Sequence, residues 1–401
     1  MSGIAVRRIC RATEEDVNKL AEMADVDPER LKSKYFGCRN EIILAYGAGS
    51  DEINCLRRAA GATGMFCYRC SDIRGEARSL PTMLLAATPL ELEKLAADIY
   101  DEQRELSESL RHCLSGNLQE SWRIGGGRTL ELDRPLIMGV LNLTPDSFYA
   151  HSRIKAVDDV LRRAERMAEE GADIIDIGGE STRPGAEPVP EDEEVLRVAP
   201  VVEALVAELD GLPVSVDTYK ADVARAALDA GATIINDIGA GLLDRRMLET
   251  VAWSGAGYVL MHMRGKPRTM QQSTDYDDLP GEVFSFFREG LERCTLAGID
   301  SGRVALDPGI GFGKKPAGNY ELLARLEEFH SLGRPLLVGA SRKSFLALAG
   351  QDHPAQRLEG SLVACTVAVL SGARILRVHD VSSSYRAART ASVFAGITGS
   401  F

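Results

Sequence analysis

The sequence predicts an α/β protein in which a small α+β domain precedes a (β/α)8 barrel. The chain has 401 residues, which is too long for one small domain and about right for two. After residue 133, eight short apolar runs alternate with helix-like runs over roughly 265 residues, a usual length for such a barrel. Each apolar run ends in polar residues or glycine, as expected at the C-terminal face of a barrel. A doubly wound open sheet is the alternative, but it rarely needs eight equally spaced parallel strands.

The first 120 residues predict the α+β domain. Helix-like runs cover residues 14–34, 51–60 and 89–113, and strand-like runs cover residues 41–46, 65–70 and 81–88. A proline at position 89 suits the first turn of the last helix. Gly47-Ala-Gly49 follows a strand, but without a later glycine it is poor evidence for dinucleotide binding. These patterns assign no function to the domain.

Six of the eight cysteines lie before residue 120. Cys67-Tyr-Arg-Cys70 is a lone CxxC motif, and no second pair completes a zinc site. We therefore expect reduced thiols, as in most cytosolic proteins. A redox or metal role for Cys67 and Cys70 is the alternative.

A glycine-rich segment at residues 121–133 marks the boundary between the two domains. It reads SWRIGGGRTLELD, and its three consecutive glycines suit a linker followed by a short hairpin. We therefore place the domains at residues 1–120 and 121–401.

Eight strand-like runs follow in the second domain. They cover residues 136–143, 173–178, 213–217, 233–237, 258–263, 304–307, 335–339 and 375–379. Helix-like runs such as residues 157–170 and 191–209 lie between them. The first strand runs through six apolar positions into an amide, hydroxyls and a carboxylate, which indicates a core element that delivers a site to a surface.

Composition narrows the class of protein. A net charge of −12 makes nucleic acid an unlikely general partner. No window holds about 18 consecutive apolar residues, so no transmembrane helix is expected. The N-terminus lacks the apolar stretch of a signal peptide, and we expect a cytoplasmic protein. The acidic run at residues 187–194 is expected to be a solvated helix start.

The polar strand ends divide by chemistry. Single polar endings are often helix caps, but eight in one layer are not explained by capping alone. A carboxylate can pair with a ring N–H and an exocyclic amino group, so several endings suit a polar heterocycle. These residues are Asp217, Asn236 and Asp307, with Lys343 for a ring carbonyl or nitrogen and Met261 as an apolar wall. A surface lysine and a core methionine are the alternatives for the last two.

Other endings suit phosphate and metal. Arg183, Arg377 and His379 form a cationic group for phosphate oxygens. Asn142 offers an oxygen ligand for Mg2+, and Asp146 could assist it. The glycine run at residues 309–314 fails the Walker A spacing, and we interpret it as a tight loop that presents Phe312 over a flat ligand. His262 is expected to be structural.

The strand-end motifs resemble those of the dihydropteroate synthases, in the family's order and across the whole second domain. The matching pieces are MGVLNLTPDSF (138–148), IDIGGESTRPG (175–185), SVDT (215–218), IIND (234–237), LMHMRGKPRTMQ (260–271), LDPGIGFGK (306–314), GASRKSF (339–345) and RVHDV (377–381). The related pterin-binding methyltransferases look similar in the early motifs but are not expected to carry SRKS and RVHD.

The resemblance implies a folate-synthesis reaction that joins 4-aminobenzoate to a dihydropterin carrying a CH2-diphosphate and releases diphosphate. It implies Asp217, Asn236, Met261, Asp307 and Lys343 as pterin ligands, and Asn142 as the Mg2+ ligand. Asn142, Thr182, Arg183, Arg377 and His379 would contact the diphosphate, and Thr182, Pro184, Phe312 and Ser344 the aminobenzoate. The implied catalytic residues are Arg183, Asp217, Lys343, Arg377 and His379. A homodimer is also implied.

Two departures from the family keep alternatives open. The family usually continues TPDSF with Ser-Asp-Gly-Gly, whereas this chain reads Tyr149-Ala-His-Ser-Arg153. The minimal enzyme also lacks the N-terminal domain. The altered loop motivates a different aryl amine, as in methanopterin synthesis. A non-catalytic pterin-binding protein is a third hypothesis, which the intact phosphate-binding cations argue against.

Overall fold

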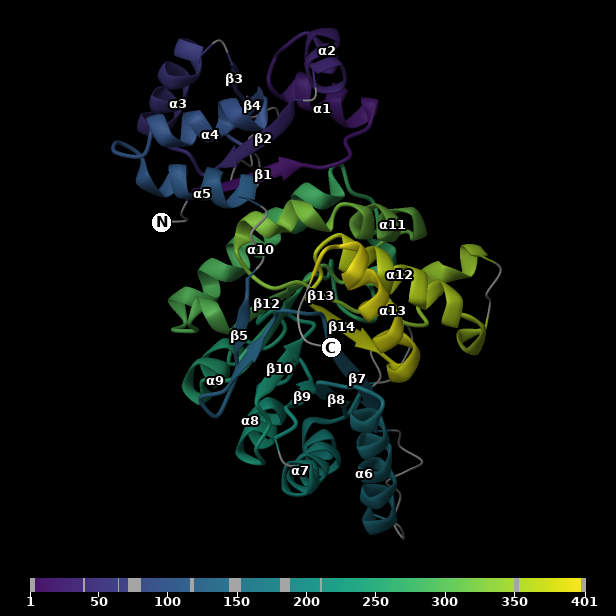
Figure 1. Cartoon of the computed structure of the whole chain (residues 1–401). Helices are drawn as coiled ribbons and strands as arrows, with labels where there is room; N and C mark the ends of the chain where they lie inside the picture. Colours follow the sequence, from purple (N-terminus) through teal and green to yellow (C-terminus); the bar gives the residue numbers. More distant parts are fainter. Residues whose placement is uncertain are drawn as a thin grey trace. The chain divides into compact units, whose positions relative to one another are not determined.

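The computed structural model describes residues 4–38, 40–63, 65–70, 81–115, 119–143, 153–180, 188–209, 211–349 and 353–397. Two compact units divide the chain (Figure 1). The N-terminal unit comprises Met1–Leu118, Pro280–Glu289 and Arg325–Gly333. The barrel unit comprises Gln119–Leu279, Gly290–Ala324 and Arg334–Phe401. The N-terminal unit therefore includes two segments from much later in the sequence.

The N-terminal unit is built on an antiparallel sheet with the strand order β1-β2-β4-β3. Its strands are β1 (Ala5–Ile9), β2 (Glu41–Tyr46), β3 (Phe66–Arg69) and β4 (Met83–Ala87). Its helices are α1 (Glu14–Met23), α2 (Pro28–Cys38), α3 (Ser50–Thr63), α4 (Pro89–Asp98) and α5 (Arg104–Ser115). The two central strands, β2 and β4, are almost wholly buried, which agrees with their continuous apolar sequence.

Each of the two long helices predicted for this unit is in fact two shorter helices. Strand β1 was not predicted. The run at residues 14–34 is two helices, because Asp25 adopts a left-handed φ of 51° and Pro28 starts a new helix. The run at residues 89–113 also breaks, since α4 ends at Asp98 and α5 begins only at Arg104. Amphipathic periodicity continued across both breaks and concealed them.

A buried charge cluster joins β1 to the short helix η4 (Leu326–Leu332) inside the N-terminal unit. Arg7 Nε donates to Glu328 Oε2 at 2.7 Å, and neither side chain is accessible to solvent. Glu328 Oε1 also accepts from Arg325 Nε at 2.6 Å and from the Cys10 backbone N–H at 3.0 Å. A carboxylate this deeply buried requires such partners, so the 325–333 segment is part of the unit's core.

The barrel unit contains eight parallel strands, as the sequence predicted. They are β7 (Leu136–Asn142), β8 (Ile174–Gly178), β9 (Val214–Asp217), β10 (Ile234–Asp237), β11 (Gly257–Met261), β12 (Val304–Asp307), β13 (Leu337–Val338) and β14 (Ile375–Val378). The order is β12-β11-β10-β9-β8-β7-β14-β13. A parallel bridge between Leu306 and Leu336 joins the two ends of this order and closes the ring. The predicted (β/α)8 barrel is confirmed.

Helices alternate with the strands around the barrel (Figure 1). They are α6 (Arg153–Glu169), α7 (Glu191–Glu208), α8 (Ala221–Asp229), α9 (Met247–Ser254), α10 (Leu279–Leu296), α11 (Pro316–Ala324), α12 (Leu358–Leu370) and α13 (Val381–Phe394). Short 3-10 helices at η2 (Met270–Gln272), η3 (Ser301–Arg303), η5 (Ser344–Ala349) and η6 (Pro354–Gln356) lie in the connections. No helix in the described parts of the chain combines the length and apolarity needed to cross a membrane.

The glycine-rich segment after residue 120 forms the floor of the barrel. It is a hairpin of β5 (Ser121–Arg123) and β6 (Thr129–Glu131), with Gly126 and Gly127 at φ +69° in the turn. Trp122 is fully buried and packs with apolar residues that the strands point inward at their starts, among them Met138 and Ile174. Its indole N–H donates to the Arg303 carbonyl at 2.8 Å. The predicted hairpin is thus present, and it closes one end of the barrel.

Replacing Trp122 with alanine is expected to destabilise the barrel unit. The change leaves a cavity where strand starts converge and should lower the free energy of unfolding by about 3–5 kcal/mol. Chemical denaturation followed by circular dichroism measures this. Trp253→Ala is the matched control: Trp253 is 77% exposed on α9, so the unfolding free energy should change by less than about 0.5 kcal/mol. An equal loss of unfolding free energy in both variants would contradict a stabilising role for Trp122.

Candidate active site

The strand register lines up several predicted site residues at the C-terminal ends of neighbouring strands. Asn142 of β7 pairs with Gly178 of β8, which pairs with Asp217 of β9, which pairs with Asn236 of β10. Met261 of β11 likewise pairs with Asp307 of β12. Because all eight strands are parallel, these ends share one face of the barrel.

A buried arginine connects two carboxylates across this face. Arg377 of β14 donates from Nε to Asp176 Oδ2 at 2.6 Å and from Nη2 to Asp217 Oδ2 at 2.7 Å. Asp176 is inaccessible to solvent and Asp217 is 9% exposed. Asn236 Nδ2 also donates to Asp176 Oδ2, at 3.3 Å. The guanidinium thereby fixes side chains from β8, β9 and β14 relative to one another.

Three buried oxygen atoms in this layer lack a hydrogen-bond partner within the described structure. They are Oδ1 of Asp176, Oδ1 of Asp217 and the Ser215 hydroxyl. An unsatisfied buried acceptor is costly, and such groups cluster at functional sites. Two carboxylate oxygens and a hydroxyl in one layer suit a ligand with several N–H donors, as the sequence predicted for a polar heterocycle.

Asp307 and Lys343 approach the same layer from β12 and from the turn after β13. Asp307 Oδ1 accepts from the Gly309 N–H at 2.7 Å. Lys343 donates from Nζ to the Ile310 carbonyl, and Nζ lies 4.6 Å from the centroid of the Phe312 ring. The ammonium and the ring therefore form a cation–π pair beside the carboxylates. This places Phe312 next to a predicted heterocycle ligand.

The glycine loop that carries Phe312 is held by a buried lysine that sequence reasoning missed. Lys314 Nζ donates to the carbonyls of Gly309 and Phe312, each at 2.9 Å, and lies 2.9 Å from His262 Nδ1. Gly309 has φ +66°, and a Cβ there would lie 1.9 Å from the His262 carbonyl oxygen. Only glycine fits this position. A lone lysine directly after an apolar glycine loop was the available signal.

Burial shifts the pKa of several site groups. Burial raises the pKa of Asp217 to about 7, opposed by Arg377 and reinforced by the negative charge of Asp176. Burial lowers the pKa of Lys343 to about 8. Burial and the nearby Arg377 lower the pKa of His379 to about 4. A pKa this low disfavours the cationic His379 that the sequence predicted, and the His379 Nδ1 lies 3.2 Å from Ser341 Oγ.

Of the remaining predicted site residues, the structure describes some and not others. Met261 is 2% exposed at the end of β11, and Ser344 is exposed at the start of η5. Asp146, Thr182, Arg183 and Pro184 lie outside the described residues, as do Tyr149 to Ser152 in the altered loop.

Asp176 and Ser215 are site residues that sequence reasoning missed. Both lie inside strands, two positions before the last residue of the strand, whereas the predicted site residues were at the strand ends. An acidic residue within the fully buried run of β8 was the signal, because aspartate is almost never fully buried without partners.

Asn142 fits the predicted Mg2+ role in a limited way. Its side chain is exposed at the end of β7, with Oδ1 3.1 Å from the position that a Cβ on Gly178 would take. Among the described residues, no group of three or more His, Cys, Asp or Glu side chains could hold a metal ion. The residues present suit an ion that takes one amide oxygen from the protein and its other ligands from phosphate and water, as Mg2+ often does.

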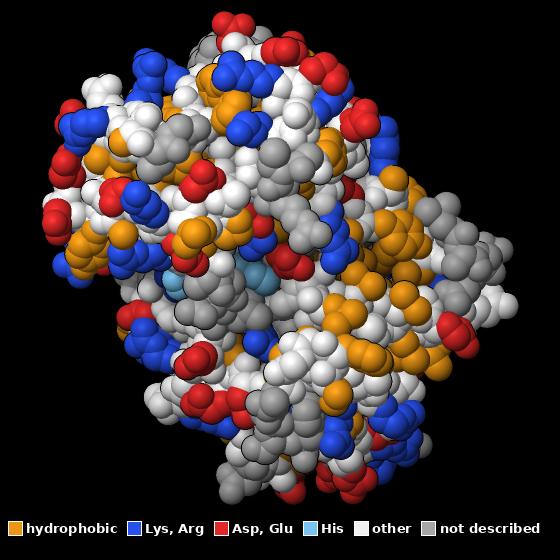
Figure 2. All heavy atoms as spheres, turned by 45° about the horizontal axis from the view of Figure 1, so that its top comes forward, with side chains coloured by type: hydrophobic (Ala, Val, Ile, Leu, Met, Phe, Trp, Pro, Cys, Tyr) orange, Lys and Arg blue, Asp and Glu red, His pale blue; other side chains and the backbone are white. Residues whose placement is uncertain are grey.

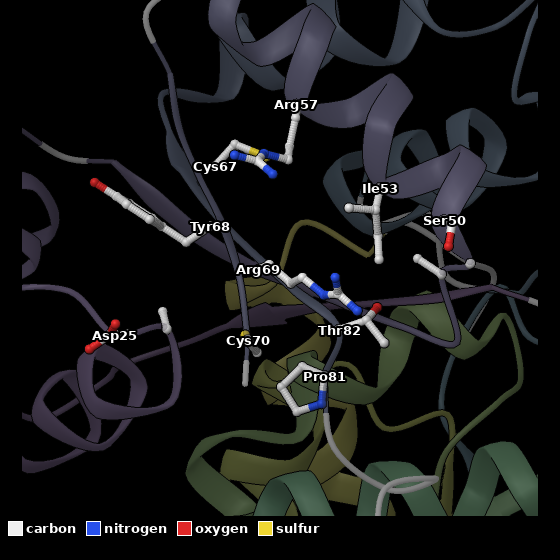
Figure 3. A pocket seen from close by; sticks show the side chains of 13 residues that line it. Asp25, Ser50, Ile53, Arg57, Cys67, Tyr68, Arg69, Cys70, Pro81 and Thr82 are labelled. Carbon is white, nitrogen blue, oxygen red and sulfur yellow. The ribbon is translucent and has the colours of Figure 1, made fainter. Parts of the chain in front are cut away.

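The CxxC cysteines belong to the N-terminal unit, whereas this layer belongs to the barrel unit. Cys67 and Cys70 line a pocket of about 740 Å3, together with residues such as Ser50, Arg57 and Arg69 (Figure 3). Both are unpaired thiols, and burial raises the pKa of each to about 12. Such thiols are protonated at neutral pH and poor nucleophiles, which agrees with the expectation of reduced thiols.

Comparison with known proteins identifies the family. A model of the pterin binding enzymes matches residues 138–379. The chain belongs to this family. Its first 137 residues lie outside the match.

Individual relatives of this pterin-binding chain are dihydropteroate synthases. The enzyme of Escherichia coli strain K12 is 47% identical over 263 residues, which are 66% of this chain and 93% of the relative. A solved Yersinia pestis dihydropteroate synthase with a sulfonamide drug complex is 46% identical, with a TM-score of 0.64 over 69% of this chain and 99% of that chain. A Xanthomonas albilineans dihydropteroate synthase with 4-aminobenzoic acid is 45% identical, with a TM-score of 0.63 over 69% and 98%. The predicted family resemblance is confirmed, and with it a transferase of folate biosynthesis.

Pterin binding is expected to depend on pH in both directions. Affinity should rise with pH through about 7, as Asp217 ionises and its carboxylate becomes able to accept two hydrogen bonds. It should fall above about 8, as Lys343 loses its proton. Titration of a 6-hydroxymethylpterin, which carries no ionising diphosphate, measures this by fluorescence.

Asp217→Asn provides the control for the acid limb of that profile. The amide cannot ionise, so the rise through about 7 should disappear while the fall above about 8 remains. A variant that kept the rise would assign the acid limb to another group, such as Asp307, whose pKa burial also raises.

Proposed function

We propose that the protein condenses (7,8-dihydropterin-6-yl)methyl diphosphate with 4-aminobenzoate, giving 7,8-dihydropteroate and diphosphate. The observation that carries the proposal is the pair of buried carboxylates, Asp176 and Asp217, which Arg377 joins through one oxygen of each while the second oxygen has no partner in the described structure. A pterin presents adjacent N–H and amino donors that match these acceptors.

The pterin contacts follow from this arrangement. Asp217 and Asn236 are assigned to the donor edge of the ring, and Asp307 to a further ring N–H. Lys343, held between the Ile310 carbonyl and the Phe312 ring, is assigned to a ring acceptor. Met261 supplies an apolar wall. A rigid set of acceptors from separate strands orients the ring with little rearrangement, which is the chief requirement of a positioning site.

Departure of diphosphate is the step that needs charge stabilisation. The C–O bond between the pterin methylene and diphosphate breaks, and its electron pair leaves with the diphosphate. Arg377 is assigned to the developing charge, and neutral His379 can donate one N–H hydrogen bond to a phosphate oxygen. Arg183 and Thr182 are proposed for the same group on the family resemblance. Mg2+ bound at Asn142 would supply further positive charge to the leaving group.

Attack by the arylamine completes the reaction. The amine nitrogen forms the new C–N bond to the electron-deficient methylene and then loses a proton to water. The carbon is already electrophilic, so no enzyme nucleophile or strong base is required. Phe312 and Ser344, with Pro184 and Thr182, are proposed to orient the 4-aminobenzoate. The presence of 4-aminobenzoic acid in the Xanthomonas albilineans relative supports this acceptor.

Amine-dependent release of diphosphate tests the proposal. Purified protein is incubated with the dihydropterin diphosphate, Mg2+ and 4-aminobenzoate, and diphosphate is measured with and without the amine. Release only with the amine is expected. Turnover restricted to a different arylamine would support the methanopterin-type alternative, and pterin binding without turnover would support the non-catalytic one.

Asp217→Asn is expected to lower kcat/KM by about a hundredfold or more, because it removes a charge-assisted contact to the ring and the ion pair with Arg377. The fold should persist, which circular dichroism checks. Asp222→Asn is the control, since Asp222 lies on α8 in an exposed ion pair with Arg246. Near-normal turnover by the Asp217 variant would remove the pterin assignment.

We further propose a homodimer through the outer surface of α12 and α13. These adjacent helices expose Val363, Leu370, Val393 and Phe394, the last at 79%. Figure 2 shows hydrophobic side chains gathered on one face of the molecule. Several large apolar side chains on neighbouring helices are typical of an association surface. A cytoplasmic location is inferred from the unpaired thiols of the described cysteines.

Phe394→Asp is expected to shift the protein from dimer to monomer in light scattering, because it places a charge within this apolar surface. Trp253→Asp, at an equally exposed site on α9, should leave the mass unchanged. A wild-type monomer at micromolar concentration would contradict the dimer.

A further inference from the structure

A serine hydroxyl at the strand ends contacts His379 at two points. The His379 backbone N–H donates to Ser341 Oγ at 3.2 Å, and the same Oγ lies 3.2 Å from the ring nitrogen Nδ1 of His379. Ser341 follows β13 and His379 follows β14, and these two strands are parallel neighbours. Both residues therefore lie at the C-terminal face of the barrel, and Ser341 is only 5% exposed there.

The turn that carries Ser341 is held by contacts of the next residue. Arg342 has a left-handed backbone with a φ of 58°, which a residue other than glycine keeps only where its surroundings hold it. Its N–H donates to Ser361 Oγ at 2.9 Å, and its carbonyl accepts from Arg357 Nη1 at 3.0 Å. Its guanidinium pairs with Asp380, to which Nε donates at 2.8 Å. Ser341 is thus presented from a firmly held turn.

The charges around His379 disfavour a proton on both ring nitrogens. Positive charge comes from Arg377, Arg342 and Lys343. The carboxylate of Asp380 opposes them, but it is already paired with Arg342. Burial and these cations lower the pKa of His379 to about 4. A neutral imidazole carries a single ring proton, on either Nδ1 or Nε2.

The Ser341 hydroxyl distinguishes these two tautomers of His379. Its oxygen accepts from the His379 backbone N–H, and among the described residues the ring Nδ1 is its only other hydrogen-bond partner. A proton on Nδ1 would point at Oγ, and the hydroxyl proton would then have no acceptor among those residues, which is costly for a buried group. With the ring proton on Nε2, the hydroxyl donates to Nδ1 and both groups are paired.

Nε2 is the ring nitrogen of His379 that is left for a ligand. It has no partner among the residues that the structure describes, and it is not buried. A phosphate oxygen is an acceptor, so the nitrogen that meets it must carry the proton. We propose that Ser341 is a positioning residue that holds the ring proton of His379 on Nε2, where an oxygen of the leaving diphosphate can accept it. The inference rests on the proposed function, which assigns His379 to diphosphate, and it gives Ser341 no contact with substrate.

Nitrogen NMR reads the tautomer without turnover. Protein labelled with 15N-histidine is measured at neutral pH, and the His379 signals are identified by their loss in His379→Gln. In the wild type we expect an unprotonated Nδ1 and a protonated Nε2. Ser341→Ala should give a mixture of the two tautomers, and Ser341→Thr, which keeps the hydroxyl, should restore the wild-type pattern. A protonated Nδ1 in the wild type, or an unchanged pattern in folded Ser341→Ala, overturns the proposal.

Ser341→Ala should also lower kcat for amine-dependent diphosphate release by about tenfold to a hundredfold, because a donor to the leaving group is no longer held in place. The dissociation constant for 6-hydroxymethylpterin, which carries no diphosphate, should stay within about twofold, because Asp217 and Asp307 keep their partners. Ser254→Ala is the control: its hydroxyl donates to the Val251 carbonyl at 3.0 Å on α9, and its loss should leave kcat unchanged. An unchanged kcat in Ser341→Ala overturns the proposal.

Combining Ser341→Ala with His379→Gln separates positioning from a general loss of structure. His379→Gln alone removes the imidazole, so adding Ser341→Ala should lower kcat by less than about twofold further. A further loss of about tenfold would mean that Ser341 acts independently of His379, and it would overturn the proposal. Absence of turnover in the wild type would instead overturn the proposed function, because the tautomer is read without turnover.

Discussion

The active face depends on one buried guanidinium. Arg377 of β14 binds Asp176 of β8 and Asp217 of β9 through one oxygen each, so the last strand shares a single charge arrangement with two strands from early in the barrel. Burial raises the pKa of Asp217, and the positive charge of Arg377 opposes that rise. With the arginine between them, each keeps a second oxygen for a ligand. The two carboxylates thus balance the charge of Arg377 and also offer acceptors for a ligand.

The barrel makes this arrangement possible by closure and register. The Leu306–Leu336 bridge joins the two ends of the sheet, and the strand order puts β14 only two strands from β8, so Arg377 reaches Asp176 and Asp217. Trp122 fills the opposite end, so side chains near the strand starts form an apolar floor. Polar groups are therefore confined to the strand ends. Buried Lys314 then holds the glycine loop, and partly buried Lys220 donates to Glu180, to Glu194 and to the Val189 carbonyl.

The strands, and several of the polar side chains that meet at their C-terminal ends, could be predicted from the sequence. Period and apolar run length placed all eight barrel strands within one or two residues, because a strand buried on both faces has a continuous apolar signature. It did not reveal the lysine–glutamate pairing at Glu194, because charge partners 26 residues apart leave no local pattern. Nor did it reveal the lowered pKa of His379, which results from burial beside Arg377. Asp176 was visible as a charged residue inside an apolar strand, but only residues at the strand ends were predicted to belong to the site.

The shared use of chain by the two units has a consequence for how the protein can be divided. The N-terminal unit takes up residues 280–289 and 325–333, so α10 begins in one unit and continues into the other. A cut after residue 118 would leave Arg7 without Glu328 and would strip the first unit of part of its core. Unfolding of the N-terminal unit would also disrupt α10, because residues 280–289 of this helix belong to that unit and its last residues belong to the barrel unit. The two units therefore do not separate at a single point in the sequence, and a truncation that removes residues 1–118 leaves residues 280–289 and 325–333 without the rest of their unit.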